Sequence, residues 1–384
     1  MKSIYLDNAA TSQVRDEVID AMATVLKSNY GNASSMHGFG RSSKSIIESC
    51  RKRIASHFNA LSSEIVFTAG GTEADNLVLH SAVRDLKVTH VITSKIEHHA
   101  VLHTIEQLAA EHKITLSYVD VFQNGTIDYQ HLENLLKSTK KTLVSLMHVN
   151  NEIGTILDIQ KVADLCKSND ALFHSDSVQS IGHYHLDVKT TPVDFLAASA
   201  HKFHGPKGIG FVFIRKNSGL KALITGGTQE RGIRAGTESI HDIVGLDESL
   251  ALSYQNLESE KTHIKGLKTY FIAQLKAHIP NIKFNGSCCD SELSTYTLVN
   301  VCLPVSEANA PMFLFQLDLK GIACSKGSAC QSGSGKGSHV LAELLTDEDL
   351  KKPSIRFSFS IYNTKKEIDA VVDSLKELIN SATS

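Results

Sequence analysis

The chain has 384 residues, with 39 lysine and arginine side chains against 41 aspartate and glutamate side chains, for a formal net charge of −2 at pH 7. This near balance gives no general attraction to nucleic acid or to membranes, so neither is expected as a direct partner. The length exceeds what a single hydrophobic core usually serves, which predicts a large domain with a smaller companion.

Short apolar runs alternate with amphipathic stretches between residues 60 and 220. Such alternation is typical of a mostly parallel sheet covered by helices, so we predict an α/β large domain. The runs predicted as strands are 64–67, 90–93, 115–119, 142–146, 171–176, 194–198 and 209–214.

The pattern loosens after a helical stretch that begins near residue 237. Hydrophobic periodicity there predicts helices and strands that no longer alternate regularly. The predicted elements are a helix at about 260–279, a strand around 297–301, a helix near 307–318, a strand at 354–360 and a C-terminal helix from residue 365.

Lys202 closes the run Ser199-Ala200-His201-Lys202 at the end of the apolar segment 194–198. A lysine in a mostly apolar setting can lose its proton, and the neutral amine can then attack an aldehyde to form a Schiff base. Asp176, at the end of the strand predicted at 171–176, offers the carboxylate that pyridoxal 5'-phosphate (PLP) needs at its pyridine nitrogen. The two strand ends predict a PLP site, although a His-Lys pair alone is more often a surface feature.

Gly70, Gly71 and Thr72 lie just after a predicted strand and just before a helix that Thr72 can cap. Free backbone N–H groups, a positive helix terminus and a hydroxyl at this junction make a phosphate site. The alternative for these residues alone is a plain turn with a helix cap.

Nine short segments, in this order, resemble those of the class V aminotransferase family, and within it the cysteine desulfurases of the NifS/IscS type. The resemblance covers nearly the whole chain and implies PLP-dependent transferase fold type I. It also implies a large PLP-binding domain at 15–255, and a small α+β domain at 1–14 and 256–384 that carries a mobile cysteine loop. The segments are 5–11, 70–76, 97–98, 148–154, Asp176 with Gln179, 199–202, 231–237, 328–330 and 354–358.

The resemblance also implies how the cofactor is held. Ser199 and His201 match positions that bind the phosphate together with Gly71 and Thr72. Thr237 matches a position that reaches the phosphate from the partner subunit of a homodimer. Without the resemblance, an ordinary loop and a helix cap within one subunit would explain Thr237.

Three further positions are implied to contact the PLP ring or the substrate. His98 stacks its imidazole on the ring, and such a group can also carry protons. Gln179 donates to the phenolic oxygen of the ring, and Asn151 contacts the substrate or the ring. The plain alternatives are a satisfied core or surface histidine for His98 and loop polarity for Asn151.

Cys330 lies in a stretch rich in glycine and serine between residues 324 and 338, which predicts an accessible and mobile loop. A thiolate on such a loop can enter the site, attack the sulfur of the substrate and leave with a persulfide. The alternative is an unreactive exposed thiol. Cys324 competes for the role, but its place beside Ile322 and Ala323 predicts a buried strand.

Arg356, in the strand predicted after Pro353, would clamp the α-carboxylate of the substrate with its bidentate fork. A surface arginine on a strand is the commoner case for a lone arginine. The chain departs from the family, which usually has proline at the positions of Ala33 and Gly337 and often alanine at Ser177. Glycine at 337 removes a φ restraint and should make the cysteine loop more flexible.

We therefore predict a homodimeric, PLP-dependent cysteine desulfurase that converts L-cysteine to L-alanine and passes sulfur to an acceptor protein, in iron–sulfur cluster assembly or another thiolation pathway. One alternative is a lyase acting on selenocysteine or another β-substituted amino acid. Another is a sulfur-relay protein whose main role is docking an acceptor. No residue cluster has metal-ligand spacing, so no metal is expected.

We expect a soluble cytoplasmic protein. Seven cysteines without a Cys-x-x-Cys pair indicate reduced thiols. No apolar stretch approaches the roughly 20 residues of a membrane span, and the first residues lack the pattern of a secretory signal.

Overall fold

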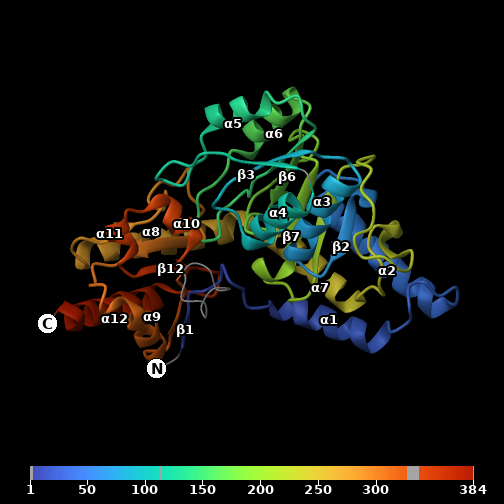
Figure 1. Cartoon of the computed structure of the whole chain (residues 1–384). Helices are drawn as coiled ribbons and strands as arrows, with labels where there is room; N and C mark the ends of the chain where they lie inside the picture. Colours follow the sequence, from blue (N-terminus) through green and yellow to red (C-terminus); the bar gives the residue numbers. More distant parts are fainter. Residues whose placement is uncertain (1–2, 113, 327–336, 384) are drawn as a thin grey trace.

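The computed structural model describes residues 3–112, 114–326 and 337–383, and its centre is a seven-stranded sheet (Figure 1). The strand order is β2-β8-β7-β6-β5-β3-β4, and β8 runs antiparallel to both of its neighbours while the remaining pairs are parallel. The predicted mostly parallel sheet is confirmed. Its strands are β2 (Ile65–Thr68), β3 (His90–Thr93), β4 (Thr115–Tyr118), β5 (Thr142–Ser145), β6 (Leu172–Asp176), β7 (Phe195–Ser199) and β8 (Gly210–Ile214).

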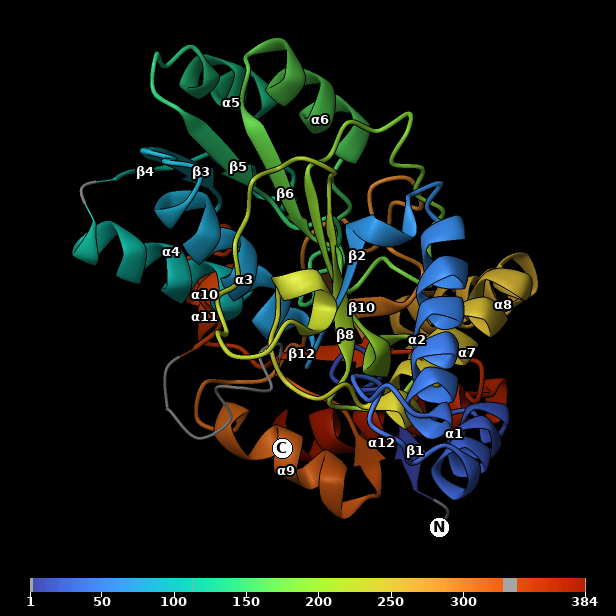
Figure 2. The same ribbon diagram turned by 90° about the vertical axis from the view of Figure 1, so that its right-hand side faces the viewer.

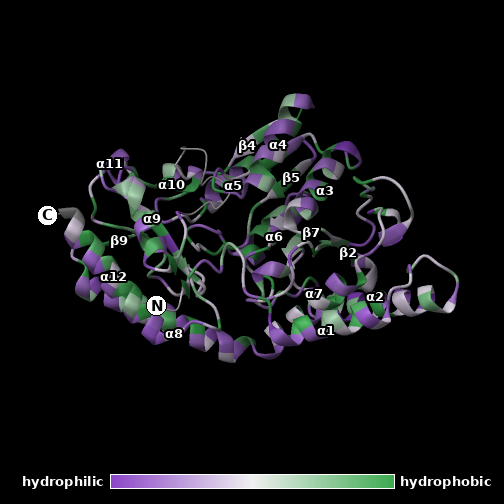
Figure 3. Cartoon of the chain, turned by 90° about the horizontal axis from the view of Figure 1, so that it is seen from below, coloured by the Kyte–Doolittle hydropathy of each residue, from purple (hydrophilic) through white to green (hydrophobic). Residues whose placement is uncertain are grey.

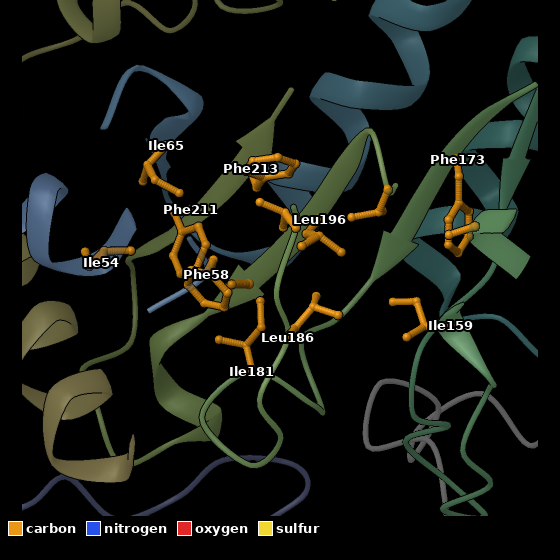
Figure 4. Packing of buried hydrophobic residues seen from close by; sticks show 14 of the residues in the cluster. Ile54, Phe58, Ile65, Ile159, Phe173, Ile181, Leu186, Leu196, Phe211 and Phe213 are labelled. Carbon is orange, nitrogen blue, oxygen red and sulfur yellow. The ribbon is translucent and has the colours of Figure 1, made fainter. Parts of the chain in front are cut away.

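Successive side chains of the central strands enter two different hydrophobic clusters, one on each face of the sheet. Leu196, Phe211 and Phe213 belong to the cluster shown in Figure 4. Phe195 and Val212 belong to the cluster on the opposite face. This distribution follows the period of two that a strand imposes on its side chains. Because both faces are buried, the strands read as continuous apolar runs, which is why the sequence reveals them.

Helices cover both faces of this sheet (Figure 2). Apolar residues of α3 and α4 pack on one face, and those of α2, α5, α6 and α7 pack on the other. Helix α1 lies against α7. The bounds of these helices are α1 (Asp16–Ser28), α2 (Gly38–Ser56), α3 (Gly71–Arg84), α4 (His99–Glu111), α5 (Tyr129–Leu136), α6 (Ile159–Ser168) and α7 (Ile240–Gln255).

The C-terminal part of the chain builds two smaller sheets with a core of their own. Strands β12, β10 and β9 form an antiparallel sheet, and β1 pairs in parallel with β11. Leu6, Phe271 and Phe357 share one hydrophobic cluster, so the N-terminal segment packs with the C-terminal part. The strands are β1 (Ile4–Tyr5), β9 (Lys283–Phe284), β10 (Leu298–Cys302), β11 (Ile322–Ala323) and β12 (Ser354–Ser358).

Helices α8 and α12 pack against each other in this part, and Figure 3 shows both with hydrophilic and hydrophobic residues along their ribbons. That mixture is expected of helices that bury one face. The helices here are α8 (Leu257–His278), α9 (Ala310–Leu319), α10 (His339–Leu344), α11 (Asp347–Leu350) and α12 (Lys365–Thr383). None of the helices in the described ranges has the length and apolar character needed to cross a membrane.

Several predicted boundaries differ from the observed ones by one to three residues. The helix predicted from residue 307 begins at Ala310, with Pro311 in its first turn. Proline suits that place because its missing N–H would have no partner there. The strand predicted to extend to residue 360 ends at Ser358. The division into domains at residues 14/15 and 255/256 stays a prediction.

Candidate active site

A cavity of about 260 Å³ opens where the carboxyl ends of β6 and β7 meet the first residues of α3 and α4. Strand β12 closes it from the C-terminal part through Arg356, and the N-terminal segment contributes Ala9 and Ala10. Ten of the predicted site residues line this one cavity, and these are Gly71, Thr72, His98, Asn151, Asp176, Gln179, Ser199, His201, Lys202 and Arg356.

Two predicted residues are not among them. Thr237 is exposed and does not line the cavity of its own chain. Cys330 lies outside the described residues. The competing thiol of Cys324 follows β11 and is half-buried, and burial, followed by the charge of Asp7, raises the pKa of Cys324 to about 12.

Lys202 ends a single 3-10 turn, Ala200–Lys202, directly after β7. Its Nζ donates to the carbonyl oxygens of Ala9 at 2.6 Å and Ala10 at 2.8 Å. The N-terminal segment thus holds the lysine in place at the cavity wall.

Asp176 ends β6 and is buried, and its Oδ1 accepts a hydrogen bond from the N–H of Val178 at 3.0 Å. Burial raises the pKa of Asp176, while His98, the N–H of Val178 and Lys202 act in the opposite direction. A cationic N–H placed against this carboxylate would offset the unfavourable burial of its charge.

His98 is the N-cap of α4, and its Nδ1 accepts from the N–H of Ala100 at 3.1 Å. The proton of the neutral ring is therefore on Nε2. Burial lowers the pKa of His98, although the nearby Asp176 acts to raise it. The cavity therefore has a flat, neutral imidazole in its wall.

The start of α3 is an open helix terminus. Gly70 is its N-cap, with φ of 152°, and provides no side chain to bind the first N–H groups. The expectation that Thr72 caps this helix was wrong, because the helix already begins at Gly71 and Thr72 lies in its first turn. A Cβ atom on Gly71 would lie 2.5 Å from Cγ2 of Val178, so only glycine fits this close approach.

His201 lies beside this terminus, and its Nδ1 is buried without a hydrogen-bond partner among the described groups. Burial, with a smaller contribution from Lys202, lowers the pKa of His201 to about 4. A wider hollow of about 670 Å³ continues from here past Ser199 to Lys207. Free helix N–H groups, hydroxyls and a neutral imidazole together suit a phosphate group.

Arg356 is one of the largest fully buried side chains, and it reaches the cavity from β12. Its Nη1 donates to the carbonyl oxygen of Asn151 at 2.6 Å, and its Nη2 forms a salt bridge with Asp7 at 2.9 Å. Its Nε is buried and has no partner among the described groups. Such a fixed guanidinium is suited to binding a carboxylate.

The residues present fit PLP. The fit rests on an amine at Lys202, a buried carboxylate at Asp176 with a neutral imidazole at His98, and a helix terminus with the unpartnered His201 nitrogen for the phosphate. Gln179 donates its Nε2 to the carbonyl oxygen of Ala9 at 2.9 Å and lies on the same wall.

The sequence analysis gave no role to several polar residues that line the cavity. Asp75 and Glu152 reach it as buried acids, and His99 and His339 lie in its wall with ring centroids 4.3 Å apart. Ser338 donates its hydroxyl to Oε2 of Glu152 at 2.5 Å. Asp75 and Glu152 belong to the segments that carry the family resemblance. The presence of an acidic residue within these segments was the signal that could have identified them as site residues.

Comparisons with known proteins show which proteins this chain is similar to. The chain is 39% identical over 383 residues to "Cysteine desulfurase IscS" of Dictyoglomus turgidum, covering 98% of this chain and 95% of that protein. It is 39% identical over 387 residues to "Putative cysteine desulfurase IscS 1" of Bacillus subtilis, covering 100% of both. The solved structure named "NIFS-LIKE PROTEIN" superposes with a TM-score of 0.89 at 31% identity, covering 99% of this chain and 100% of that chain. The profile described as Aminotransferase class-V matches residues 4–371, and the chain belongs to this family.

Proposed function

We propose that this protein is a PLP-dependent cysteine desulfurase that converts L-cysteine to L-alanine. The observation that carries the proposal is the convergence of three side chains on one cavity, Asp176 and Lys202 from the ends of the neighbouring strands β6 and β7 and Arg356 from β12 of the C-terminal part. The names of the relatives support cysteine as the substrate.

The α-carboxylate and the α-carbon of an amino-acid substrate both have candidate partners in the cavity. The guanidinium of Arg356 would hold the α-carboxylate, oriented by Asp7 and by the carbonyl of Asn151. Lys202 lines the same cavity, and its Nζ would take the proton from the α-carbon and return a proton later. When bound, PLP supplies the electron sink that stabilises the negative charge left on that carbon.

The sulfur acceptor in the proposal is the thiol of Cys330. The balanced reaction is L-cysteine plus the Cys330 thiol giving L-alanine plus a persulfide on Cys330. The S–S bond forms as the C–S bond of the substrate breaks, and the carbon that loses sulfur gains a proton. Cys324 is disfavoured as the nucleophile because burial keeps its thiol protonated near neutral pH.

The proposal includes a homodimer, in which Thr237 reaches the phosphate of the neighbouring site, and a sulfur-acceptor protein as partner. Exposure of Thr237, away from its own cavity, supports a role in a second subunit. We also propose a cytoplasmic location, because the six cysteines among the described residues are free thiols.

The test is to incubate the PLP-loaded protein with L-cysteine and a reductant and to quantify alanine and sulfide. We expect both products in equal amounts, and a protein persulfide on Cys330 by mass spectrometry when the reductant is omitted. Cys330→Ser should abolish persulfide and most alanine formation, whereas the matched Cys324→Ser should retain both. Undiminished alanine formation by Cys330→Ser would favour a lyase for selenocysteine or another β-substituted amino acid. Absence of turnover in the wild-type protein would favour a relay protein that docks an acceptor.

A further inference from the structure

A second carboxylate lies beside Asp176 at the base of the cavity. Asp75 is on α3, one turn after its first residue, and only 1% of its surface is exposed. It lines the same cavity as Asp176. Its Oδ1 lies 3.3 Å from Nε2 of His174, and neither atom has a hydrogen bond to another described group. The catalytic scheme above gives Asp75 no task.

The charged and titratable groups that face Asp75 come from two other elements. His174 and Asp176 are on β6, and Glu97 precedes α4. In the described part of the chain, no lysine or arginine forms a salt bridge with Asp75. A buried carboxylate ion without a cation is strongly unfavourable, and two neighbouring acids add repulsion. Burial, then Asp176 and Glu97, raise the pKa of Asp75 well above its usual range.

His174 cannot supply the missing positive charge. It is fully buried, and this burial lowers the pKa of His174 to about 3. Its Nδ1 lies 2.9 Å from the hydroxyl oxygen of Ser145. If Nδ1 carries the proton and donates it to Ser145, then Nε2 has a lone pair directed at Asp75, and this lone pair requires a hydrogen-bond donor. A protonated carboxyl group of Asp75 is the donor within reach.

We propose that Asp75 is a positioning residue that stays protonated and shares its proton with Nε2 of His174, so that Asp176 alone faces the pyridine nitrogen as a carboxylate ion. The inference rests on the proposed function, because it assigns the charge state of the PLP site. An uncharged Asp75 fills the base of the cavity without adding a second negative charge beside Asp176. It also fixes the neutral His174 ring on the same strand as Asp176.

Asp75→Asn tests the assignment because the amide has the shape of the neutral acid and retains an N–H donor for His174. We expect PLP to bind the Asp75→Asn apoprotein with a dissociation constant within about threefold of wild type, measured by absorbance titration. Asp176→Asn is the matched control, and its dissociation constant should rise by about tenfold or more, as expected for the loss of a charge-assisted hydrogen bond. Weakening of PLP binding by tenfold or more in Asp75→Asn would overturn the assignment.

Infrared difference spectroscopy gives a second readout that does not depend on PLP or on turnover. The wild-type protein at pH 7 should show the carbonyl stretch of a protonated carboxyl group, and Asp75→Asn should remove it. Asp75→Ser serves the same purpose should the asparagine variant fail to fold. A wild-type spectrum without a band that these variants remove would mean that Asp75 is ionised. Turnover of L-cysteine by the wild-type protein is the separate readout for the desulfurase proposal.

Discussion

Nη2 of Arg356 lies 2.9 Å from Oδ1 of Asp7, and this contact joins β12, the last strand of the described chain, to the N-terminal segment at the wall of the cavity. The arginine is 2% exposed, so its charge is compensated mainly by this contact and by the carbonyl of Asn151. Both Nη atoms of the guanidinium are therefore held in place before substrate binds. Substrate binding then costs little additional side-chain entropy at Arg356.

Arg356→Gln should lower kcat/KM for L-cysteine by about 10- to 100-fold, mainly through a higher KM, because a hydrogen bond to a charged group contributes roughly 1.5–3 kcal/mol. Steady-state kinetics at several L-cysteine concentrations measure this. Arg41→Gln, at an exposed arginine of α2, is the control and should behave as wild type. An unchanged KM in Arg356→Gln would remove this residue from the substrate site.

Lys202→Ala should lower turnover by about 10²–10⁴-fold, the range for removing a general acid–base group, and abolish covalent attachment of PLP. Borohydride reduction of the PLP-loaded wild-type protein, followed by peptide mapping, should place the label on Lys202. Lys207→Ala is the control, since Lys207 is exposed at the outer hollow, and it should keep the label. A label found on Lys207 in the wild-type protein would contradict the central assignment.

Thr237→Ala should raise the PLP dissociation constant without changing the isolated fold, because the exposed hydroxyl is proposed to act in the partner's site. Mixing Thr237→Ala with the inactive Lys202→Ala should produce mixed dimers in which one of the two sites has both wild-type residues. Activity above the sum of the two separate variants would indicate that sites are shared. A fully active monomer in sedimentation analysis would exclude this arrangement.

His204 should make the protein less stable in mild acid. It is 3% exposed, and burial lowers its pKa to about 4, so the folded state binds fewer protons than the unfolded state below the usual histidine pKa of about 6.5. Its stabilising contribution is therefore present above pH 6.5 and is lost as the pH falls toward 4, with a slope of about 1.4 kcal/mol per pH unit for one proton.

The matched variant is His204→Asn, because position 204 has a φ of 67° that asparagine tolerates and the amide can still donate to the carbonyl of Gln13. The free energy of unfolding from urea titrations at pH 7 and pH 5 should fall less for the variant than for wild type. The difference should correspond to about one proton taken up on unfolding. Equal losses in both proteins would show that His204 is protonated in the folded state.

The sequence predicted the central sheet well because its strands are buried on both faces and therefore apolar throughout, as in Phe195–Ser199. It missed two-residue strands such as Ile4–Tyr5, since this segment is extended by pairing with Ile322–Ala323, far along the chain, and has no pattern of its own. Short motifs predicted the residues that line the cavity. The contact between Asp75 and His174 could not be predicted from the sequence, because it depends on how α3 packs against β6.

The N-terminal segment contacts two of the proposed site residues at once. Asp7 pairs with Arg356, and the carbonyls of Ala9 and Ala10 accept from Lys202. A purification tag or fusion partner joined directly before residue 4 would disturb the contacts of this segment with both Arg356 and Lys202. Tags for kinetic work are therefore better placed after the end of α12. A tag at the start of the chain could lower activity in the same way as a substitution in the active site.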